Sequence, residues 1–278
     1  MTGTASEQTL AAQVAAALQE DIGTGDITAA LLPADAQATA QVIARDPAVL
    51  CGIAWFNAVF QQIEPLIQCD WQLQDGDTLV PNEPICELHG PALAILTGER
   101  TALNFLQTLS GTATTAARYV QAVAGTGVQI RDTRKTLPGL RLAQKYAVRC
   151  GGASNQRMGL YDAILIKENH IQAAGSIEAA LAAAHRVAAG VPIQIEVETL
   201  EELTKALDAG AESILLDNFT LDQLRQAVEM KQGRARLEAS GGISLATVRV
   251  VAETGVDAIS IGDITKDVQS VDYSMRML

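Results

Sequence analysis

Short apolar runs alternate with amphipathic segments in the second half of the chain. Six runs rich in aliphatic residues follow one another from residue 128 onward: VQIRD, AILIK, IQIEVE, SILLD, ARLEAS and AISIG. From the second run onward their centres lie about 20–30 residues apart, which is the length of one strand, one helix and two loops. The pattern predicts βα units around a parallel sheet, and six or seven such units predict a TIM-like barrel.

The first half of the chain has a different pattern. Apolar residues at helical spacing predict a first helix over 10–18, and the DIGTGDIT segment that follows has the composition of a loop. From about residue 38 to 88, Pro, Asn, Asp and Gly separate four β-type runs: TAQVIAR, AVLCGIAW, DTLV and PICELHG. Two Ala-rich helices are then expected over 92–109 and 114–123, joined at Ser110 and Gly111.

The fold class is therefore α/β, with an N-terminal α+β domain and a TIM-like α/β barrel of about seven strands. We place the N-terminal domain at residues 1–112 and the barrel at residues 113–278. The last residues are expected to pack back onto the N-terminal domain.

Each apolar run of the second half ends in charged or small polar residues. These end groups are Asp132 with Arg134 and Lys135, Lys167, Glu196 with Glu198, Asp217, Ser240 to Gly242, and Gly262 with Asp263. In parallel barrels the carboxyl ends of the strands form the active face, so we expect a site there. Asp217 and Asp263 could instead cap the helices that follow. Capping does not explain Arg134 or Lys167, because positive charge is unfavourable near a helix N-terminus.

Five basic residues flank apolar or Gly-rich segments in the middle third of the chain: Arg100, Arg134, Lys135, Arg157 and Lys167. Arginine binds carboxylate or phosphate in a bidentate manner, and lysine adds a compact charge. A convergent pocket of these groups fits a small dicarboxylate. The alternative, that they are solvated surface residues, is strongest for Arg100.

Glu196 and Glu198 alternate along one strand and therefore lie on the same face. Magnesium takes one or two carboxylates together with substrate phosphates, so Glu196 and Asp217 are candidates to hold Mg²⁺ indirectly or through pyrophosphate. The alternative is a buried ion pair with nearby lysines. The Gly-rich segments 240–244 and 262–265 each follow a strand and precede a helix, which predicts phosphate binding by backbone N–H groups. Such segments are also common as simple turns.

Composition narrows the classes of function. The formal charge is −12, from 32 acidic and 20 basic side chains, which argues against a nucleic-acid-binding surface. The N-terminus lacks basic residues before an apolar run, and no uncharged apolar stretch approaches about 20 residues, so we expect a cytoplasmic protein without membrane contact. The four cysteines fall in no C-x-x-C pair, and we expect buried, reduced thiols.

Longer motifs resemble the quinolinate phosphoribosyltransferases, also called carboxylating nicotinate-nucleotide pyrophosphorylases. The most specific are DTRKTLPGLRLAQKYAVRCGG and NQRMGLYDAILIKENHI, followed by IEVE and LLDNF. DIGTGDIT, GERTALNFLQTLSG and ASGGI extend the resemblance over nearly the whole chain. It implies the two domains described above, a homodimer with shared active sites, and an N-terminal domain that serves as a substrate lid and makes dimer contacts.

The resemblance also implies roles for individual residues. The quinolinate pocket would comprise Arg134, Lys135, Gln156, Arg157 and Lys167, with Arg100 reaching in from the partner subunit. The catalytic residues would be Lys135, Lys167, Glu196 and Asp217, the last two also near the ribose and Mg²⁺. The phosphate-binding positions would be Ser240, Gly241, Gly242, Gly262 and Lys266.

Two positions depart from the family pattern. Many members have histidine where Gln156 stands, and some have histidine in place of Lys266. Glutamine can hydrogen-bond a carboxylate but cannot carry charge or shuttle a proton.

The implied reaction is the transfer of phosphoribosyl from phosphoribosyl pyrophosphate to quinolinate with loss of CO₂, as a step of NAD biosynthesis. A related enzyme that uses nicotinate is one alternative, which the excess of basic groups disfavours. A repurposed, non-catalytic pyrophosphorylase-like protein is another, which the intact TRKT and LIKENH runs disfavour.

Overall fold

The computed structural model describes residues 3–28, 31–187 and 190–278. By its internal contacts the chain forms two compact units. The first consists of Met1–Ala117, Thr136–Gly152 and Asp267–Leu278, and the second of Arg118–Lys135 and Ala153–Lys266. The predicted domain boundary between residues 112 and 113 stays a prediction.

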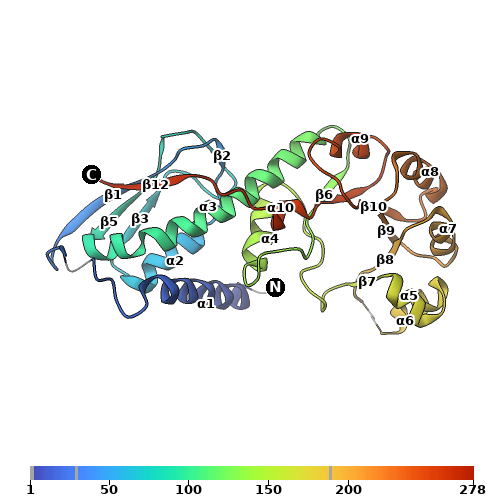
Figure 1. Cartoon of the computed structure of the whole chain (residues 1–278), viewed down its shortest axis with the longest axis horizontal. Coiled ribbons are helices and arrows are strands. Elements are labelled where there is room, and N and C mark those ends of the chain that lie inside the picture. The colour runs from blue at the N-terminus through green and yellow to red at the C-terminus, as the bar shows by residue number, and fades with distance from the viewer. Residues whose placement is uncertain (1–2, 29–30, 188–189) are drawn as a thin grey trace. The chain divides into compact units, whose positions relative to one another are not determined.

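The first unit is an α+β structure (Figure 1). Its helices are α1 (Gly3–Ile22), α2 (Ile53–Ile63), α4 (Arg141–Cys150) and most of α3 (Ala92–Ala122). Its strands are β1 (Gln37–Ala44), β2 (Ala48–Val49), β3 (Gln68–Trp71), β4 (Thr78–Leu79), β5 (Pro84–Pro91) and β12 (Tyr273–Met277). One antiparallel sheet has the order β12-β1-β5-β3, and β2 pairs with β4. The C-terminal strand β12 therefore packs beside β1, with Ala44 opposite Tyr273.

Helix α3 is continuous from Ala92 to Ala122, so the predicted break at Ser110 and Gly111 is wrong. The Ser110 hydroxyl accepts a hydrogen bond of 3.0 Å from the Cys51 N–H. A side chain at Gly111 would collide with the backbone carbonyl of Gln269. Both residues are small because other segments approach the helix closely, and tertiary packing here overrides the low helix propensity of Ser and Gly.

The β-type prediction for the run AVLCGIAW is correct for β2 alone, because helix α2 begins at Ile53. The Asp75 carboxylate accepts hydrogen bonds from the N–H groups of Gly52 at 2.9 Å and Ile53 at 3.2 Å. These are among the backbone donors that the first turn of a helix leaves unpaired. The capping side chain is more than 20 residues away along the chain, so local sequence patterns do not reveal the helix start.

The second unit contains a parallel sheet, as predicted. Its strands are β6 (Gln129–Arg131), β7 (Ile164–Ile166), β8 (Ile193–Val197), β9 (Ser213–Asp217), β10 (Arg236–Ser240) and β11 (Ala258–Ser260). Each falls within one of the six predicted runs, and the strand order is β6-β11-β10-β9-β8-β7. In the described part of the chain this sheet has six strands, and a single parallel bridge from Ser154 to Arg131 continues it beyond β6. The arrangement is that of a TIM-like α/β barrel.

Helices follow the strands and cover the outer side of the sheet (Figure 1). They are α5 (Glu168–Ala174), α6 (Ile177–Val187), α7 (Leu200–Asp208), α8 (Leu221–Lys231), α9 (Val248–Ala252) and α10 (Asp263–Lys266). Strand β9 is apolar on both faces, since Ile214, Leu215 and Leu216 are all buried, as expected of a sheet covered on both sides.

Threonines cap two of these helices. The Thr199 and Thr220 hydroxyls accept from the third backbone N–H of α7 and α8. Asp217 is therefore not the cap of α8.

Among the described residues, no helix is both long enough and apolar enough to cross a membrane. The cytoplasmic location stays a prediction.

Candidate active site

The predicted site residues of the second unit gather at the carboxyl edge of the parallel sheet. Neighbouring strands end together there, with Ser240 paired with Asp217 and Ser260 paired with Arg131. The strand register therefore places the residues that follow each strand at one edge, although they are far apart in sequence.

Arg134 and Arg157 form the cationic part of this edge. Burial lowers the pKa of Arg157, and the positive charge of Arg134 lowers it further. Arg157 Nη1 donates to the carbonyl of Ala163 at 3.3 Å, which holds its side chain near β7. Two half-buried guanidinium groups that repel each other are a site that an anion would stabilise.

Lys167 and Glu196 form an ion pair across β7 and β8. The Lys167 Nζ lies 3.3 Å from both carboxylate oxygens of Glu196. The side chain of Glu196 is only 11% exposed, and burial raises its pKa although Lys167 acts in the opposite direction. The negative charges of Asp217 and Glu168 raise this pKa further. The sequence leaves open an ion pair with a nearby lysine as the alternative to Mg²⁺ binding, and this ion pair is present in the structure.

His170 has a structural role beside this pair. Its Nδ1 accepts a hydrogen bond of 3.0 Å from the Lys167 N–H at the start of α5. This contact fixes the chain direction where the Lys167 side chain leaves the strand.

Lys135 lies against the last glycine loop. A Cβ atom at Gly262 would stand 3.3 Å from Lys135 Cδ. The Thr265 hydroxyl donates to the Lys135 carbonyl at 2.7 Å, which joins the TRKT turn to the start of α10. The structure therefore brings a predicted substrate-pocket lysine next to a predicted phosphate loop.

The glycines after β10 adopt conformations that other residues rarely adopt. Gly241 and Gly242 have φ angles of +101° and +59°, and a Cβ at Gly241 would overlap the side chain of Asn218. A hollow of about 260 Å³ lies beside both glycines and Ser240. Lys266 at the next loop is exposed and pairs with Asp263 at 3.1 Å.

A buried polar network below this edge was not predicted from the sequence. Gln156 Nε2 donates to Gln194 at 2.9 Å, and Gln194 Nε2 donates to Glu238 at 3.0 Å. Glu238 is 2% exposed and also accepts from Arg131 at 2.9 Å and from the Ser260 hydroxyl. The available signal was a polar residue in the middle of an apolar strand: Gln in IQIEVE and Glu in ARLEAS.

Asp132 orients the segment that carries Gln156. It is fully buried, and its carboxylate accepts from Asn155 Nδ2 at 2.6 Å and from the Gln156 N–H at 2.8 Å. Because a buried carboxylate needs such donors, this pairing determines where residues 155–157 lie.

Glu196 and Asp217 form an acidic pair whose electrostatics suit a divalent cation. The charge of Asp217 raises the pKa of Glu196, which means that the two carboxylates repel each other. A cation between them would relieve that repulsion, and carboxylate oxygens are ligands that Mg²⁺ accepts. These residues therefore fit the metal that the sequence predicts.

Two residues singled out from the sequence, Arg100 and Glu198, lie outside these contacts of the sheet edge. Arg100 is exposed on α3 in the first unit, so its contribution to the pocket stays a prediction. Glu198 is also exposed, and it shares a hollow with Glu196 as the strand alternation predicts.

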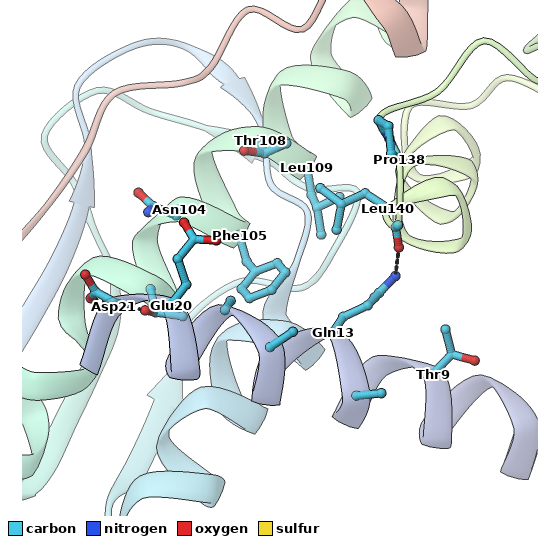
Figure 2. Close-up of a pocket in the computed structure, with 15 residues that line it drawn as sticks. Thr9, Gln13, Glu20, Asp21, Asn104, Phe105, Thr108, Leu109, Pro138 and Leu140 are labelled. Carbon is cyan, nitrogen blue, oxygen red and sulfur yellow. Dashed lines mark hydrogen bonds between the residues drawn. The ribbon is translucent and has the colours of Figure 1, made fainter. Parts of the chain in front are cut away.

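A larger hollow of about 600 Å³ lies in the first unit, between α1, α3 and residues 138–140 (Figure 2). Gln13 Nε2 donates to the Gly139 carbonyl across it at 2.6 Å. Glu20 and Asp21 stand on its wall, and the described residues that line it include no Lys, Arg or His. An anionic substrate would therefore bind poorly in this hollow, although the hollow is large.

A TIM-like sheet whose carboxyl edge carries arginines, lysines, paired carboxylates and glycine loops defines an enzyme that acts on anionic, phosphate-bearing substrates. Two family profiles match the chain: "Quinolinate phosphoribosyl transferase, N-terminal domain" over residues 26–110 and "C-terminal domain" over residues 112–276. The chain belongs to the quinolinate phosphoribosyl transferase family.

Individual relatives are similar over almost their full length. A Bacillus subtilis protein named probable nicotinate-nucleotide pyrophosphorylase (carboxylating) is 44% identical over 92% of this chain and 89% of its own. The nicotinate-nucleotide pyrophosphorylase (carboxylating) of Mycobacterium leprae is 41% identical over 94% of each. The structure of the nicotinate-nucleotide pyrophosphorylase from Francisella tularensis superimposes with a TM-score of 0.96 at 44% identity, covering 98% of this chain and 97% of that one.

Proposed function

We propose that this chain transfers phosphoribosyl from phosphoribosyl pyrophosphate to quinolinate and releases pyrophosphate and CO₂, giving nicotinate mononucleotide. The observation that carries the proposal is the cationic group of Arg134, Arg157 and Lys167 on the same sheet edge as two glycine loops, in a chain of this family. One part of the edge suits carboxylates and the other suits phosphates.

The second carboxylate of quinolinate distinguishes it from nicotinate. Arg134 and Arg157 already repel each other in the folded chain, so a dianion would neutralise more of the unfavourable charge than a monoanion. Gln156, oriented by Gln194, would add a neutral hydrogen bond to a carboxylate. The pocket therefore favours the dicarboxylate.

The chemical step is a displacement at the anomeric carbon of the ribose by the pyridine nitrogen. Its transition state places positive charge on the ribosyl ring, which the carboxylates of Glu196 and Asp217 would stabilise. Lys135, beside the Gly262 loop, would stabilise the negative charge that develops on the departing pyrophosphate. The enzyme would act by positioning and by charge, without a covalent intermediate.

Magnesium would be held by Glu196 and Asp217, indirectly or through pyrophosphate, and would supply positive charge for the leaving group. After transfer, the quaternary ring nitrogen can accept the electron pair left at C2 when its carboxylate departs as CO₂. Lys167, which is paired with Glu196 in this structure, would exchange that partner for a substrate carboxylate.

The enzyme would work as a homodimer. Arg100 is exposed on α3, in the motif that in this family reaches into the site of the partner subunit. Its guanidinium would complete the cationic pocket there.

The reaction is tested by measuring pyrophosphate and CO₂ release with Mg²⁺, phosphoribosyl pyrophosphate and either quinolinate or nicotinate. Release of both products with quinolinate alone is expected. Pyrophosphate release with nicotinate would assign the non-decarboxylating reaction, and no release with either substrate would contradict the proposed function.

A further inference from the structure

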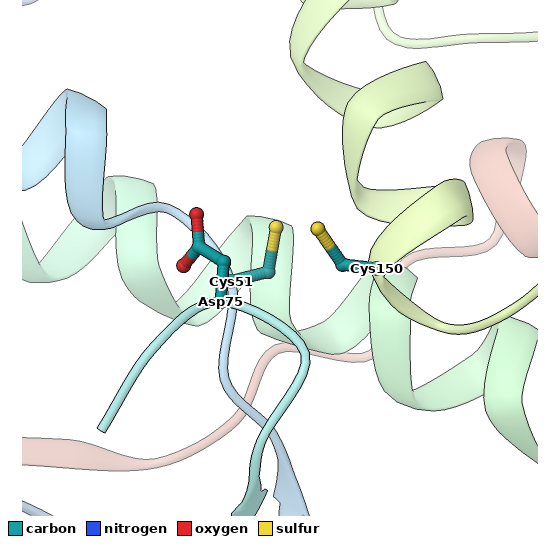
Figure 3. A group of neighbouring side chains, drawn as sticks. All are labelled: Cys51, Asp75 and Cys150. Atoms are coloured by element: carbon teal, nitrogen blue, oxygen red, sulfur yellow. The ribbon is translucent and has the colours of Figure 1, made fainter.

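Two cysteines far apart in sequence meet in the first unit. Cys51 follows β2 and Cys150 is the last residue of α4. Their sulfur atoms and a carboxylate oxygen of Asp75 all lie within 4.8 Å of one another. Figure 3 shows the two sulfur atoms beside each other between the two segments.

The two thiols differ in exposure. Cys51 is fully buried, whereas Cys150 is partly exposed, which corrects the prediction that all the cysteines are buried. An oxidant in solution therefore reaches Cys150 first.

The Asp75 carboxylate beside this pair is committed to other hydrogen-bond partners. Asp75 is already engaged, since it accepts from Gly52 and Ile53 at the start of α2 and from the Tyr146 hydroxyl at 2.8 Å. The N-terminus of α2 is positive, and the Arg149 guanidinium lies 5.6 Å from the centre of the Tyr146 ring. The positive charge of Arg149 lowers the pKa of both thiols, whereas the negative charge of Asp75 raises it. The three hydrogen bonds that Asp75 already accepts make it a poor metal ligand.

We propose that Cys51 and Cys150 form a reversible disulfide when the protein meets a hydroperoxide, with Cys150 as the reacting thiol and Cys51 as the resolving thiol. A hydrogen bond from Cys51 lowers the pKa of Cys150 and outweighs its partial burial, which acts in the opposite direction. The bond with Cys150 and burial raise the pKa of Cys51. The partly exposed sulfur is thus also the one that ionises more readily, as attack requires.

The chemistry balances in two steps. The Cys150 thiolate attacks one peroxide oxygen, the O–O bond breaks, and the departing oxygen takes a proton to leave as alcohol or water. The Cys51 sulfur then attacks the sulfenic acid, and its thiol proton and the hydroxyl group leave as water. Two thiols are oxidised to one disulfide while the hydroperoxide is reduced, and a dithiol such as thioredoxin's reverses the change.

The remaining two cysteines provide an internal control. Cys69 and Cys86 also hydrogen-bond to each other, but they lie diagonally across β3 and β5, where Cys69 is opposite Leu88 and Cys86 is opposite Trp71. The Cα atoms of diagonal neighbours are about 7–8 Å apart, whereas the Cα atoms of disulfide-bonded cysteines are roughly 4.4–6.8 Å apart. The sheet therefore opposes closure of this second pair.

The test oxidises the reduced full chain with a small excess of hydrogen peroxide, counts thiols after denaturation and maps peptides without reduction. We expect the thiol count to fall from four to two, with a linked peptide that contains residues 51 and 150, and to return to four with dithiothreitol. On oxidation, the double variant Cys69→Ala/Cys86→Ala should lose both of the thiols it retains, Cys51 and Cys150. The double variant Cys51→Ala/Cys150→Ala should keep both of its thiols in the reduced form.

Two outcomes would overturn the proposal: four thiols surviving oxidation of the unsubstituted chain, or a linked peptide that joins Cys69 to Cys86 instead. Metal analysis of the untreated protein adds a third. Stoichiometric zinc that is lost on substitution of Cys51 and Cys150 would show that the pair is a metal site. The peptide map uses the unsubstituted chain, so the result does not depend on the folding of any variant.

Discussion

Gln194 donates a hydrogen bond of 3.0 Å from Nε2 to the carboxylate of Glu238 in the interior of the parallel sheet. Because a carboxylate is an acceptor, the amide oxygen of Gln194 must face the other way, toward Gln156. At the far end the Gln156 oxygen accepts from the Arg157 N–H at 2.8 Å. Both ends of this row have fixed polarity, so the orientation of both amides is determined.

Gln194→Leu should therefore disturb the pocket from below. Glu238 and Gln156 each lose a buried partner, which costs roughly 1–3 kcal/mol of stability, and Gln156 loses its fixed orientation. We expect kcat/KM for quinolinate to fall roughly 10-fold or more, with a small change in KM for phosphoribosyl pyrophosphate. Gln226→Leu, on the exposed face of α8, is the control. Equal losses for both substrates would argue against a role for the network in quinolinate binding.

Glu196→Gln should separate stability from activity. Because burial raises the pKa of Glu196 despite Lys167, the folded state favours the neutral form, and ionisation is destabilising above the folded-state pKa. The variant should therefore be more stable than the parent at pH 7, and the difference should vanish as the pH falls below the ordinary glutamate pKa of about 4.3. Denaturant unfolding at several pH values measures this.

Activity should move in the opposite direction in the same variant, with kcat falling roughly 10-fold or more because the charge proposed to stabilise the ribosyl ring is lost. Glu201→Gln is the matched control, since Lys205 lowers the pKa of that exposed carboxyl and its removal should bring no gain in stability. A less stable Glu196→Gln protein at pH 7 would contradict the electrostatic account.

Lys135→Ala should lower kcat by roughly 100-fold or more with little effect on folding. The side chain is exposed, so the substitution leaves the core intact and stability should change by about 0.5 kcal/mol or less. Lys205→Ala, which removes an exposed lysine paired with Glu201 on α7, should leave both quantities unchanged. Near-normal kinetics of Lys135→Ala would remove this residue from the site.

Gly241→Ala should damage the predicted phosphate loop more than its backbone angle alone explains. The new methyl group must displace the Asn218 side chain in addition to adopting a φ of +101°. Gly210→Ala is matched to it, because Gly210 has a φ of +80° with no atom near the new Cβ. We expect both variants to lose about 1 kcal/mol or more of stability, and Gly241→Ala alone to raise KM for phosphoribosyl pyrophosphate about 10-fold. Similar kinetics in the two variants would contradict phosphate binding at this loop.

The parallel sheet was readable from the sequence because its strands are buried on both faces. Such strands appear as short continuous apolar runs, and each of the six predicted runs contains one. The same reasoning located the charged residues at the strand ends, because the carboxyl ends of parallel strands share one edge.

The sequence-based predictions of helix bounds were wrong where long-range contacts determine the local structure. Ser110 and Gly111 suggested a helix break, but they are small because residues 51 and 269 pack against α3. The start of α2 was missed because its cap, Asp75, comes from a distant turn. Neither partner is visible in a local window of sequence.

The sequence alone thus determined the fold class, the family and the chemical types at the sheet edge, since periodicity and motifs are local properties. The contacts between these groups, by contrast, were visible in the tertiary structure alone. The pairing of Lys167 with Glu196, the row from Gln156 to Glu238 and the contact of Cys51 with Cys150 all join residues more than 20 positions apart. Such contacts depend on how the strands and helices pack, and no spacing along the chain encodes them.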